Sequence, residues 1–418
     1  MDRIILHSDI NSCFANVECL YRPELRGKPV SVCGSIEERH GIILASTIEA
    51  KRFGVKTGEA IWQAKQKCPD LITLTPNYDR YVRFSKLSRA IYADYTDRVE
   101  PFGLDEAFLD VTGNPKAHGD GRAIAEEIRQ RIKFELGVTV SVGASYNKIF
   151  AKLGSDLKKP DAVTTITRDN YRDKVWPLPV GDLLYVGRAT KHKLSELGIA
   201  TIGDLANTKE TVLRKQLGKM GSILYSFANG YDRTPVALHG ESSIVKSISN
   251  GTTPPRDMMD IQDARIILMM LSESVAERLR EHGFAAGLIQ INYRDTSLNY
   301  FQKQVKLDRP TSVSTEILET ATDLLRQSWG FSLPLRSITV GAADLCPENT
   351  PSQISIFADE HRRIKREKLE LAIDDVRRRF GHYSIARAVT HLDDTLGKVD
   401  ARGEHVSYPV GFFKEYCR

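Results

Sequence analysis

The chain has 418 residues, of which 41% are hydrophobic and 27% charged, and its formal net charge is +5 at pH 7. This length is too great for one hydrophobic core and suggests about three domains, while the small positive charge permits binding to a polyanion without requiring it. No apolar run approaches the roughly 20 residues of a membrane span, no signal-peptide pattern opens the chain, and the cysteines lack the paired spacing of a zinc site. We therefore expect a cytoplasmic protein with no membrane partner.

The first region alternates predicted strands and helices. A strand over Ile4–Leu6 leads to Asp9. The segment 81–95 is typical of an amphipathic helix, because its apolar residues recur at helical spacing. The expected buried face of this helix consists of Phe84, Leu87, Ile91 and Tyr95.

The run Val99–Asp110 contains the adjacent acids Asp105 and Glu106. Neighbouring residues of a regular strand point to opposite faces, so both acids can face one site only near a turn. The apolar segments alternate and Gly103 interrupts them, which predicts a hairpin with the acids at or just past its tip. Such a turn could bring both carboxylates beside Asp9.

The acids Asp9, Asp105 and Glu106 would then form a crowded cluster. Carboxylates this close repel one another unless hard cations lie between them. Two Mg²⁺ ions about 3.5–4 Å apart, held by shared carboxylates, form the apparatus for phosphoryl or nucleotidyl transfer. The alternative is an acid pair on an exposed turn with no chemical role.

A second amphipathic helix follows the hairpin and precedes Gly137, its expected C-cap. Its apolar stripe consists of Ile124, Ile128, Ile132 and Leu136. The strand Val138–Val142 and the helix Asn147–Asp156 come next. Strand, helix, hairpin, helix and strand in this order indicate an α+β sheet with helices packed on one side.

The pattern changes beyond about residue 166. The region that follows is helical with short breaks, a linker comes after it, and a second α+β unit is predicted from residue 244. The expected elements of that unit are the strands 244–253, 288–293, 300–307 and 336–343 and the helices 261–281 and 315–328. The chain is thus expected to contain at least two separate cores.

Three blocks of this sequence, in this order and at this spacing, resemble the Y-family (ImpB/MucB/SamB) DNA polymerases. These are the lesion-bypass enzymes, among them bacterial polymerase IV and the catalytic subunit of polymerase V. The blocks are Asp9–Glu18, Gly103–Asp110 and Ser141–Lys152, the last continuing to Asp156–Pro160. The resemblance implies a template-directed DNA polymerase of the low-fidelity translesion type, which adds dNMPs to a primer 3′ end during DNA damage tolerance.

The resemblance also implies a multidomain, α+β, right-hand polymerase fold. A ferredoxin-like palm would carry the acids, and a helical thumb would contain a helix-hairpin-helix. The implied parts are the palm (1–10 and 78–166), small fingers (11–77), the thumb (167–233), a linker (234–243), an α+β little finger (244–346) and a helical C-terminal tail (347–418).

The resemblance further implies a two-metal site. Asp9 and Asp105 would bridge two Mg²⁺ ions, for which Mn²⁺ could substitute. Glu106 would bind the ion beside the primer hydroxyl, and the backbone carbonyl of Ile10 would add an oxygen ligand. Phe14 occupies the place of the family's steric gate, an aromatic ring that excludes a ribose 2′-OH and so selects dNTPs. An ordinary core phenylalanine is the alternative.

Positive charges for the triphosphate would come from Lys159 and Lys51. Lys51 stands where many relatives carry Arg, and Ile48 where many carry Tyr. A lysine offers a point charge without a bidentate fork, and isoleucine offers no hydrogen bond, so a weaker hold on the nucleotide is expected. The polymerase V branch tends to share this pattern, which leaves a need for accessory subunits open.

Primer–template DNA is the other implied partner. Lys148 and Lys152 share a helix face, from which they could reach a DNA phosphate or form a solvated edge. Gly187 would open a thumb helix whose backbone N–H groups hold a phosphate. The family's second glycine is Tyr185 here, so a plain helical turn is the alternative.

The tail has two features. The peptide containing Gln353, Ile356 and Phe357 resembles the sliding-clamp-binding (β clamp) peptide of bacterial polymerases, in which an aliphatic–aromatic pair fills a hydrophobic pocket. A short strand packed on the little finger is the alternative. Farther on, a helix is predicted from the apolar stripe Leu369, Ile373, Val376 and Phe380.

Two other functions fit part of this pattern. One is a non-catalytic DNA- or clamp-binding regulator on the same fold, against which the intact acids Asp9, Asp105 and Glu106 argue. The other is a nucleotidyl cyclase on a similar palm, which would need neither the thumb-like region nor the clamp peptide.

Overall fold

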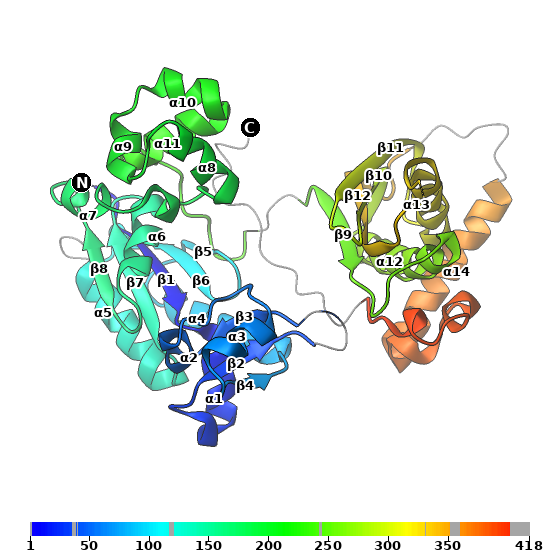
Figure 1. Cartoon of the computed structure of the whole chain (residues 1–418), viewed down its shortest axis with the longest axis horizontal. Coiled ribbons are helices and arrows are strands. Elements are labelled where there is room, and N and C mark those ends of the chain that lie inside the picture. Colours follow the sequence, from blue (N-terminus) through cyan, green and yellow to red (C-terminus); the bar gives the residue numbers. More distant parts are fainter. Residues whose placement is uncertain are drawn as a thin grey trace. The chain divides into compact units, whose positions relative to one another are not determined.

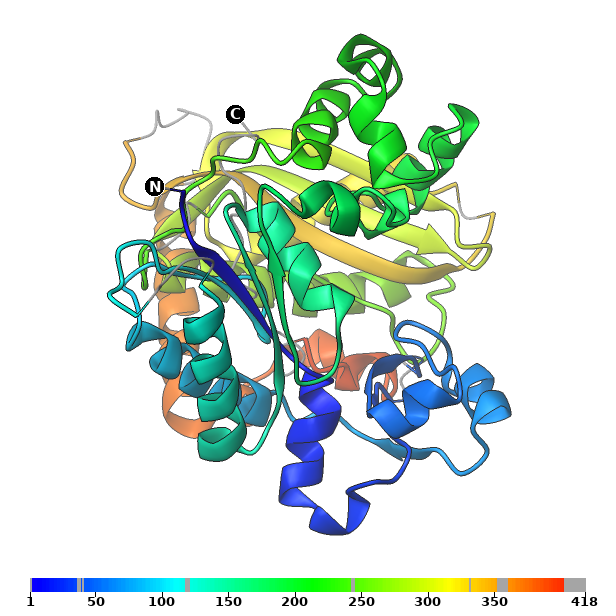
Figure 2. The same ribbon diagram turned by 90° about the vertical axis from the view of Figure 1, so that its left-hand side faces the viewer.

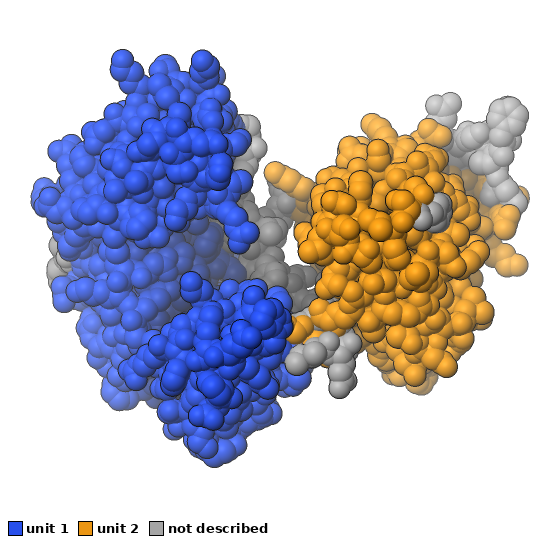
Figure 3. Space-filling view, viewed as in Figure 1, with its two compact units in different colours: residues 1–34, 42–243, 407–418 blue, residues 35–41, 244–406 orange. Residues whose placement is uncertain are grey.

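A computed structural model describes residues 2–35, 39, 41–116, 121–241, 245–330, 332–351 and 360–401 of the chain. These residues fall into two compact units, which Figure 3 colours separately. Unit 1 contains the described residues up to 34 and from 42 to 241, and unit 2 those from 35 to 41 and from 245 to 401. Within the described ranges, no helix is long and apolar enough to cross a membrane.

Unit 1 is built on a five-stranded sheet in the order β5-β6-β1-β7-β8 (Figure 1). Its strands are β1 (Ile5–Ile10), β5 (Val99–Pro101), β6 (Glu106–Asp110), β7 (Val140–Ser145) and β8 (Val163–Ile166). Strand β1 lies in the middle, antiparallel to both β6 and β7, and all of its residues are buried. The predicted α+β class is confirmed for this unit.

Helices cover both faces of this sheet. They are α4 (Tyr78–Ala93), α5 (Arg122–Arg131), which continues as a π-helical turn to Gly137, and α6 (Lys148–Leu157). Ser8 of β1 bonds to Tyr92 of α4, whereas its neighbour His7 bonds to Ser155 of α6. Because successive strand residues point to opposite faces, α4 and α6 lie on opposite sides of the sheet. The prediction that the helices pack on one side concerned the segments that form α4 and α5, and α6 packs on the other face.

A small second sheet follows β1 in the chain. Strand β1 runs directly into α1 (Cys13–Tyr21), as Figure 2 shows, and three strands in the order β3-β2-β4 come next. The elements are β2 (Val30–Cys33), β3 (Ile43–Ser46), α2 (Ile48–Arg52), α3 (Ile61–Lys67) and β4 (Ile72–Leu74). This part has its own core, which includes Cys33, Ile43 and Cys68.

The region between β8 and residue 228 is helical with short breaks, as predicted. The helices are α7 (Tyr171–Val175), α8 (Arg188–Glu196), α9 (Ile202–Asn207), α10 (Glu210–Leu217) and α11 (Lys219–Ala228). They share one hydrophobic core with α6, in which Phe150 packs with Leu194 and Phe227. Val236, in the predicted linker, is fully buried, and the Arg3 guanidinium donates hydrogen bonds to nearby carbonyl oxygens. The start of the predicted linker is thus fixed to the five-stranded sheet of unit 1.

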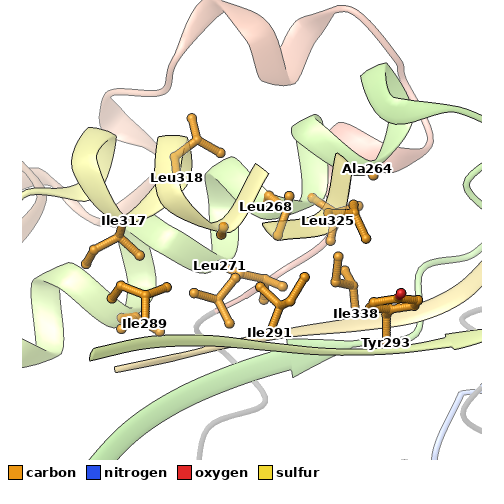
Figure 4. Packing of buried hydrophobic residues seen from close by; sticks show 14 of the residues in the cluster. Ala264, Leu268, Leu271, Ile289, Ile291, Tyr293, Ile317, Leu318, Leu325 and Ile338 are labelled. Carbon is orange, nitrogen blue, oxygen red and sulfur yellow. The ribbon is translucent and has the colours of Figure 1, made fainter. Parts of the chain in front are cut away.

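Unit 2 is a four-stranded antiparallel sheet in the order β11-β10-β12-β9. Its elements are β9 (Ser247–Thr252), α12 (Ile261–Glu281), β10 (Phe284–Asp295), β11 (Tyr300–Thr311), α13 (Ser314–Ser328) and β12 (Leu335–Pro347). Figure 4 shows the core, in which Leu268 and Leu271 of α12 and Leu325 of α13 pack with Ile289 and Ile291 of β10. Every predicted strand and helix of this unit is present.

The predicted tail helix is α14 (Glu360–Phe380), followed by short 3₁₀ turns. Of the predicted apolar stripe, Ile373 is buried but Phe380 is 73% exposed. The helix instead packs through charged residues: Asp374 pairs with Arg280 of α12 at 2.7 Å. A second pair joins Arg377 to Glu273 at 2.9 Å. The face of α14 that contacts α12 is therefore largely ionic.

Candidate active site

The predicted acid hairpin is confirmed. Strand β5 turns into β6, and Glu106, the first residue of β6, lies directly opposite Asp9 of β1. Ile10 donates its N–H to the carbonyl oxygen of Asp105 at 2.9 Å, so the residue before β6 is tied to the same strand. The turn itself contains Gly103 with φ +95°, a conformation that favours glycine.

These acids line a cavity of about 480 Å³ in unit 1. The cavity lies between the five-stranded sheet and the three-stranded sheet of unit 1, since residues of both line it. It brings together Asp9, Ile10, Phe14, Ile48, Lys51, Asp105, Glu106 and Lys159. All of these residues were predicted from the sequence as parts of one site, with Ile48 as a departure from the family pattern.

Burial and mutual repulsion control the charges of the acids. Burial, followed by the charges of Asp9 and Glu106, raises the pKa of Asp105 to about 7. Burial and the charge of Glu106 likewise raise the pKa of Asp9. Burial would raise the pKa of Glu106 too, but the His7 hydrogen bond and the charge of Lys152 outweigh it and lower that pKa to about 2. Such crowding favours the binding of a cation.

Two lysines lie among these carboxylates. Lys159 Nζ is 2.7 Å from Asp9 Oδ2, and Lys152 Nζ is 3.2 Å from Glu106 Oε1 and 3.5 Å from Asp9 Oδ2. Asp156 pairs with both lysines, at 2.8 Å and 3.1 Å. The acid cluster is thus partly neutralised by the chain's own ammonium groups.

Lys148 and Lys152 do not share the exposed surface that was predicted for DNA contact. Lys148 is 1% exposed, and its Nζ lies 2.6 Å from Glu100 Oε2. Its burial contradicts the prediction that it contacts a DNA phosphate. Lys152 points into the acid cluster described above, which places it beside the reacting groups and not on a solvated edge.

The site has the donors that Mg²⁺ requires. Carboxylate and carbonyl oxygens suit a hard cation, and Glu106 Oε2 is buried without a well-aligned hydrogen bond. Among the described residues, no three acidic, histidine or cysteine side chains form a ready-made metal cage. Mg²⁺ is usually held by one or two carboxylates together with substrate phosphates, so its binding does not require such a cage. The residues present therefore fit the expected ions.

Phe14, the predicted steric gate, is held by an aromatic neighbour that the sequence did not reveal. Its ring stacks on Tyr81 of α4 with the centroids 4.1 Å apart and the planes at 7°. The Tyr81 hydroxyl donates to Glu18 at 3.1 Å and accepts the N–H of Asn77 at 3.1 Å. Tyr81 is fully buried, so it forms a fixed support behind the half-buried Phe14.

The lysines predicted for the triphosphate are positioned by small polar residues. Lys51 Nζ donates to Ser12 Oγ at 2.9 Å. Lys159 precedes a loop whose Asp161 N–H donates to Asn11 Oδ1 at 2.9 Å. Burial, followed by the charge of Lys159, lowers the pKa of Lys51. Asn11 and Ser12 are therefore site residues that were missed, although they lie inside the first motif block.

Two predicted contacts lie outside this cavity. Gly187 is the N-cap of α8, and a Cβ built on it would meet nothing within 4 Å, so no packing requirement explains this glycine. Tyr185 has φ +70°, which is a costly conformation for a bulky residue and one in which glycine is favoured. The predicted clamp-binding residues Gln353, Ile356 and Phe357 lie outside the described residues.

Comparison with known proteins covers both units. The model of the impB/mucB/samB family matches residues 8–156, that of the family's C-terminal domain residues 245–356, and that of the DNA polymerase-iota thumb domain residues 181–232. DNA polymerase IV of Acetivibrio thermocellus is 52% identical over 399 residues, which cover 96% of this chain and 100% of that protein.

Relatives of lower identity are also DNA polymerases. DNA polymerase IV 1 of Bacillus subtilis is 35% identical over 416 residues, 99% of this chain and 98% of that protein. Among solved structures, the Y-family DNA polymerase chimera Dbh-Dpo4(243-245)-Dbh matches with a TM-score of 0.72 and 26% identity, covering 82% of this chain and 99% of that one. The chain therefore belongs to the impB/mucB/samB family, the Y-family DNA polymerases.

Proposed function

We propose that this chain is a low-fidelity translesion DNA polymerase whose catalytic ions are held by Asp9, Asp105, Glu106 and the carbonyl of Ile10. The observation that carries this proposal is the register of the sheet, which puts Glu106 opposite Asp9. Asp105 lines the same cavity from the hairpin. The chemistry of two Mg²⁺ ions, or of Mn²⁺ in their place, would activate the primer 3′ hydroxyl and neutralise the leaving pyrophosphate.

The lysines of the site serve the dNTP. Lys159 and Lys152 now balance the charge of Asp9 and Glu106. Cations held by Asp9 and Glu106 would neutralise these carboxylates in place of the lysines, and Lys159 could then donate a charge-assisted hydrogen bond to a triphosphate oxygen. Lys51 reaches the same cavity from α2 as a second positive charge. Lys159 would thereby exchange its ion pair with Asp9 for a contact with the dNTP.

Selection of the sugar falls to Phe14. Its ring lies in the lining of the cavity and cannot retreat, because Tyr81 packs flat against it. A ribose 2′-OH directed at this ring would have to displace Phe14 against the buried Tyr81. The site is therefore expected to prefer dNTPs over rNTPs.

The partners follow from this role. Primer–template DNA is the substrate, with Gly187 at a phosphate of the duplex, and the expected location is the cytoplasm. The peptide around Gln353, Ile356 and Phe357 would attach the enzyme to the β sliding clamp. Accessory subunits remain a proposal that the Glu49-Ala50-Lys51 pattern supports.

Primer extension tests the proposal. Wild-type protein with Mg²⁺ and dNTPs should extend a primer over short stretches, and the double variant Asp105→Ala/Glu106→Ala should not. Both proteins should bind primer–template DNA equally well in a fluorescence anisotropy assay, which serves as the folding control. DNA binding without extension by the wild type, even with added clamp, would favour the regulator.

A further inference from the structure

A histidine lies directly beneath the acid cluster. His7 precedes Asp9 by two positions on β1 and therefore faces the same side of the sheet. It is completely buried, with its ring 4.6 Å from that of Phe108 and 6.0 Å from that of Phe102. The sequence motifs and the proposed metal chemistry assign no role to this side chain.

Both ring nitrogens of His7 have a polar neighbour. Nε2 lies 3.1 Å from Glu106 Oε2, and Nδ1 lies 2.9 Å from the Ser155 hydroxyl of α6. Ser155 can give its proton to Nδ1 or to the carbonyl oxygen of Lys152, which is 2.7 Å away. When it donates to Nδ1, the imidazole proton resides on Nε2 and points at the Glu106 carboxylate.

The surroundings of the ring do not explain an imidazole. Phe102 and Phe108 form an apolar wall that would accept leucine or phenylalanine without loss, and burying a polar ring is costly unless its nitrogens are paired. Within the described residues, neither His7 Nε2 nor Glu106 Oε2 has a partner in well-aligned hydrogen-bond geometry, and their own contact is a close approach of 3.1 Å. Glu106 Oε2 lies 3.1 Å from both His7 Nε2 and Lys152 Nζ, and the Glu106 carboxylate is the polar group that faces His7 Nε2.

We propose that His7 is a positioning residue for Glu106. Its Nε2–H holds one carboxylate oxygen of Glu106, so that the carboxylate keeps the orientation in which it lines the cavity with Asp9 and Asp105. This donation requires the tautomer in which Ser155 donates its proton to Nδ1. The inference rests on the proposed role of Glu106 as a metal ligand, and it extends the site by a hydrogen-bonded pair behind that ligand.

The effect should appear in metal binding. Outer groups that orient metal ligands typically change metal affinity or activity by about 10- to 100-fold when they are removed. Loss of the Nε2 donor should therefore raise the Mg²⁺ concentration for half-maximal extension by about 10-fold or more. At saturating Mg²⁺ the KM for dNTP should stay close to that of the wild type, because no contact with the triphosphate is lost.

Two amides separate positioning from packing. The side-chain nitrogen of Gln can take the place of imidazole Nε2, and that of Asn the place of Nδ1. His7→Gln should therefore keep the donation to Glu106 and remain within about threefold of the wild type, whereas His7→Asn should show the full shift. His7→Phe, which preserves the ring volume, should stay folded in a thermal melt and show the same shift as His7→Asn.

The measurement is made in two ways on the full chain. Mg²⁺ titration of primer extension gives the functional requirement, and Mn²⁺ binding to the protein–DNA complex, followed by electron paramagnetic resonance, gives metal affinity without turnover. Equal shifts in His7→Gln and His7→Asn, or a wild-type metal requirement in His7→Phe, would overturn the inference.

Glu106→Gln separates this inference from the function on which it rests. If Glu106→Gln leaves Mn²⁺ binding unchanged, Glu106 is not a ligand and the proposed metal site fails with the inference. If Glu106→Gln weakens Mn²⁺ binding but His7→Asn and His7→Phe do not, only the role of His7 is lost. The expected result is weaker Mn²⁺ binding in Glu106→Gln, His7→Asn and His7→Phe. Mn²⁺ binding in His7→Gln should stay close to that of the wild type.

Discussion

Replacing Tyr81 by leucine should relax the selection against ribonucleotides. The stack of Phe14 on Tyr81, with centroids 4.1 Å apart, is the contact that keeps the gate ring in place. An aromatic pair contributes about 0.5–1.5 kcal/mol beyond the area it buries. If that energy resists displacement of the gate, its loss should reduce discrimination about 2- to 13-fold. Leucine keeps most of the volume, so the cavity should not collapse.

The assay is single-nucleotide insertion with a matched dNTP and rNTP pair. The ratio of the two kcat/KM values is the quantity to compare, because it does not depend on the fraction of active protein. Tyr81→Phe is the matched control: it keeps the stacked ring, loses the hydroxyl contact to Glu18, and should retain nearly wild-type discrimination. A wild-type ratio in Tyr81→Leu, or an equal loss in Tyr81→Phe, would refute the supporting role of this ring.

Three further predictions concern the charges around the site. Lys148→Met should lower the free energy of unfolding by about 3–5 kcal/mol, measured by urea denaturation, because it leaves the Glu100 carboxylate buried without its cation. Lys159→Ala should raise the KM for dNTP by about 10- to 100-fold in steady-state kinetics, the worth of one charged hydrogen bond, and Lys159→Arg should raise it less. The pKa of Asp105 is raised to about 7 by burial and its acidic neighbours, so a proton must leave before a cation binds. The Mg²⁺ requirement should therefore increase as the pH falls below about 7 and level off above it.

The sequence predicted the site well where the signal was local. Alternating apolar residues and Gly103 located the hairpin, whose turn could bring the adjacent acids beside Asp9. The family resemblance then indicated that the three acids form one site. The elements of unit 2 were equally clear, because long strands and amphipathic helices have distinct periods.

Contacts between distant segments were not predictable in the same way. Lys148 looked like a surface residue because its partner, Glu100, is 48 residues away and on another strand. Tyr81 and Phe14 come from different helices, so neither motif indicated their stack. Leu87 was assigned to a buried face by spacing alone and is 38% exposed, because α4 turns its polar Ser85 and Ser88 inward.

The tail shows a further limit of periodicity. An apolar stripe predicts which side of a helix is buried only when the contact is apolar. Helix α14 packs on α12 through Asp374 and Arg377, whose partners on α12 are Arg280 and Glu273. Charged residues of this kind are read from sequence as solvent-facing, so the apolar stripe did not reveal this ionic contact.

The central claim is that Asp105 and Glu106 bind the catalytic ions together with Asp9. The most direct measurement is to count Mn²⁺ ions by electron paramagnetic resonance in a complex with primer–template DNA and a non-hydrolysable dNTP analogue. The account predicts two coupled ions in the wild type and the loss of at least one in Asp105→Ala/Glu106→Ala. Two coupled ions in that double variant would contradict it.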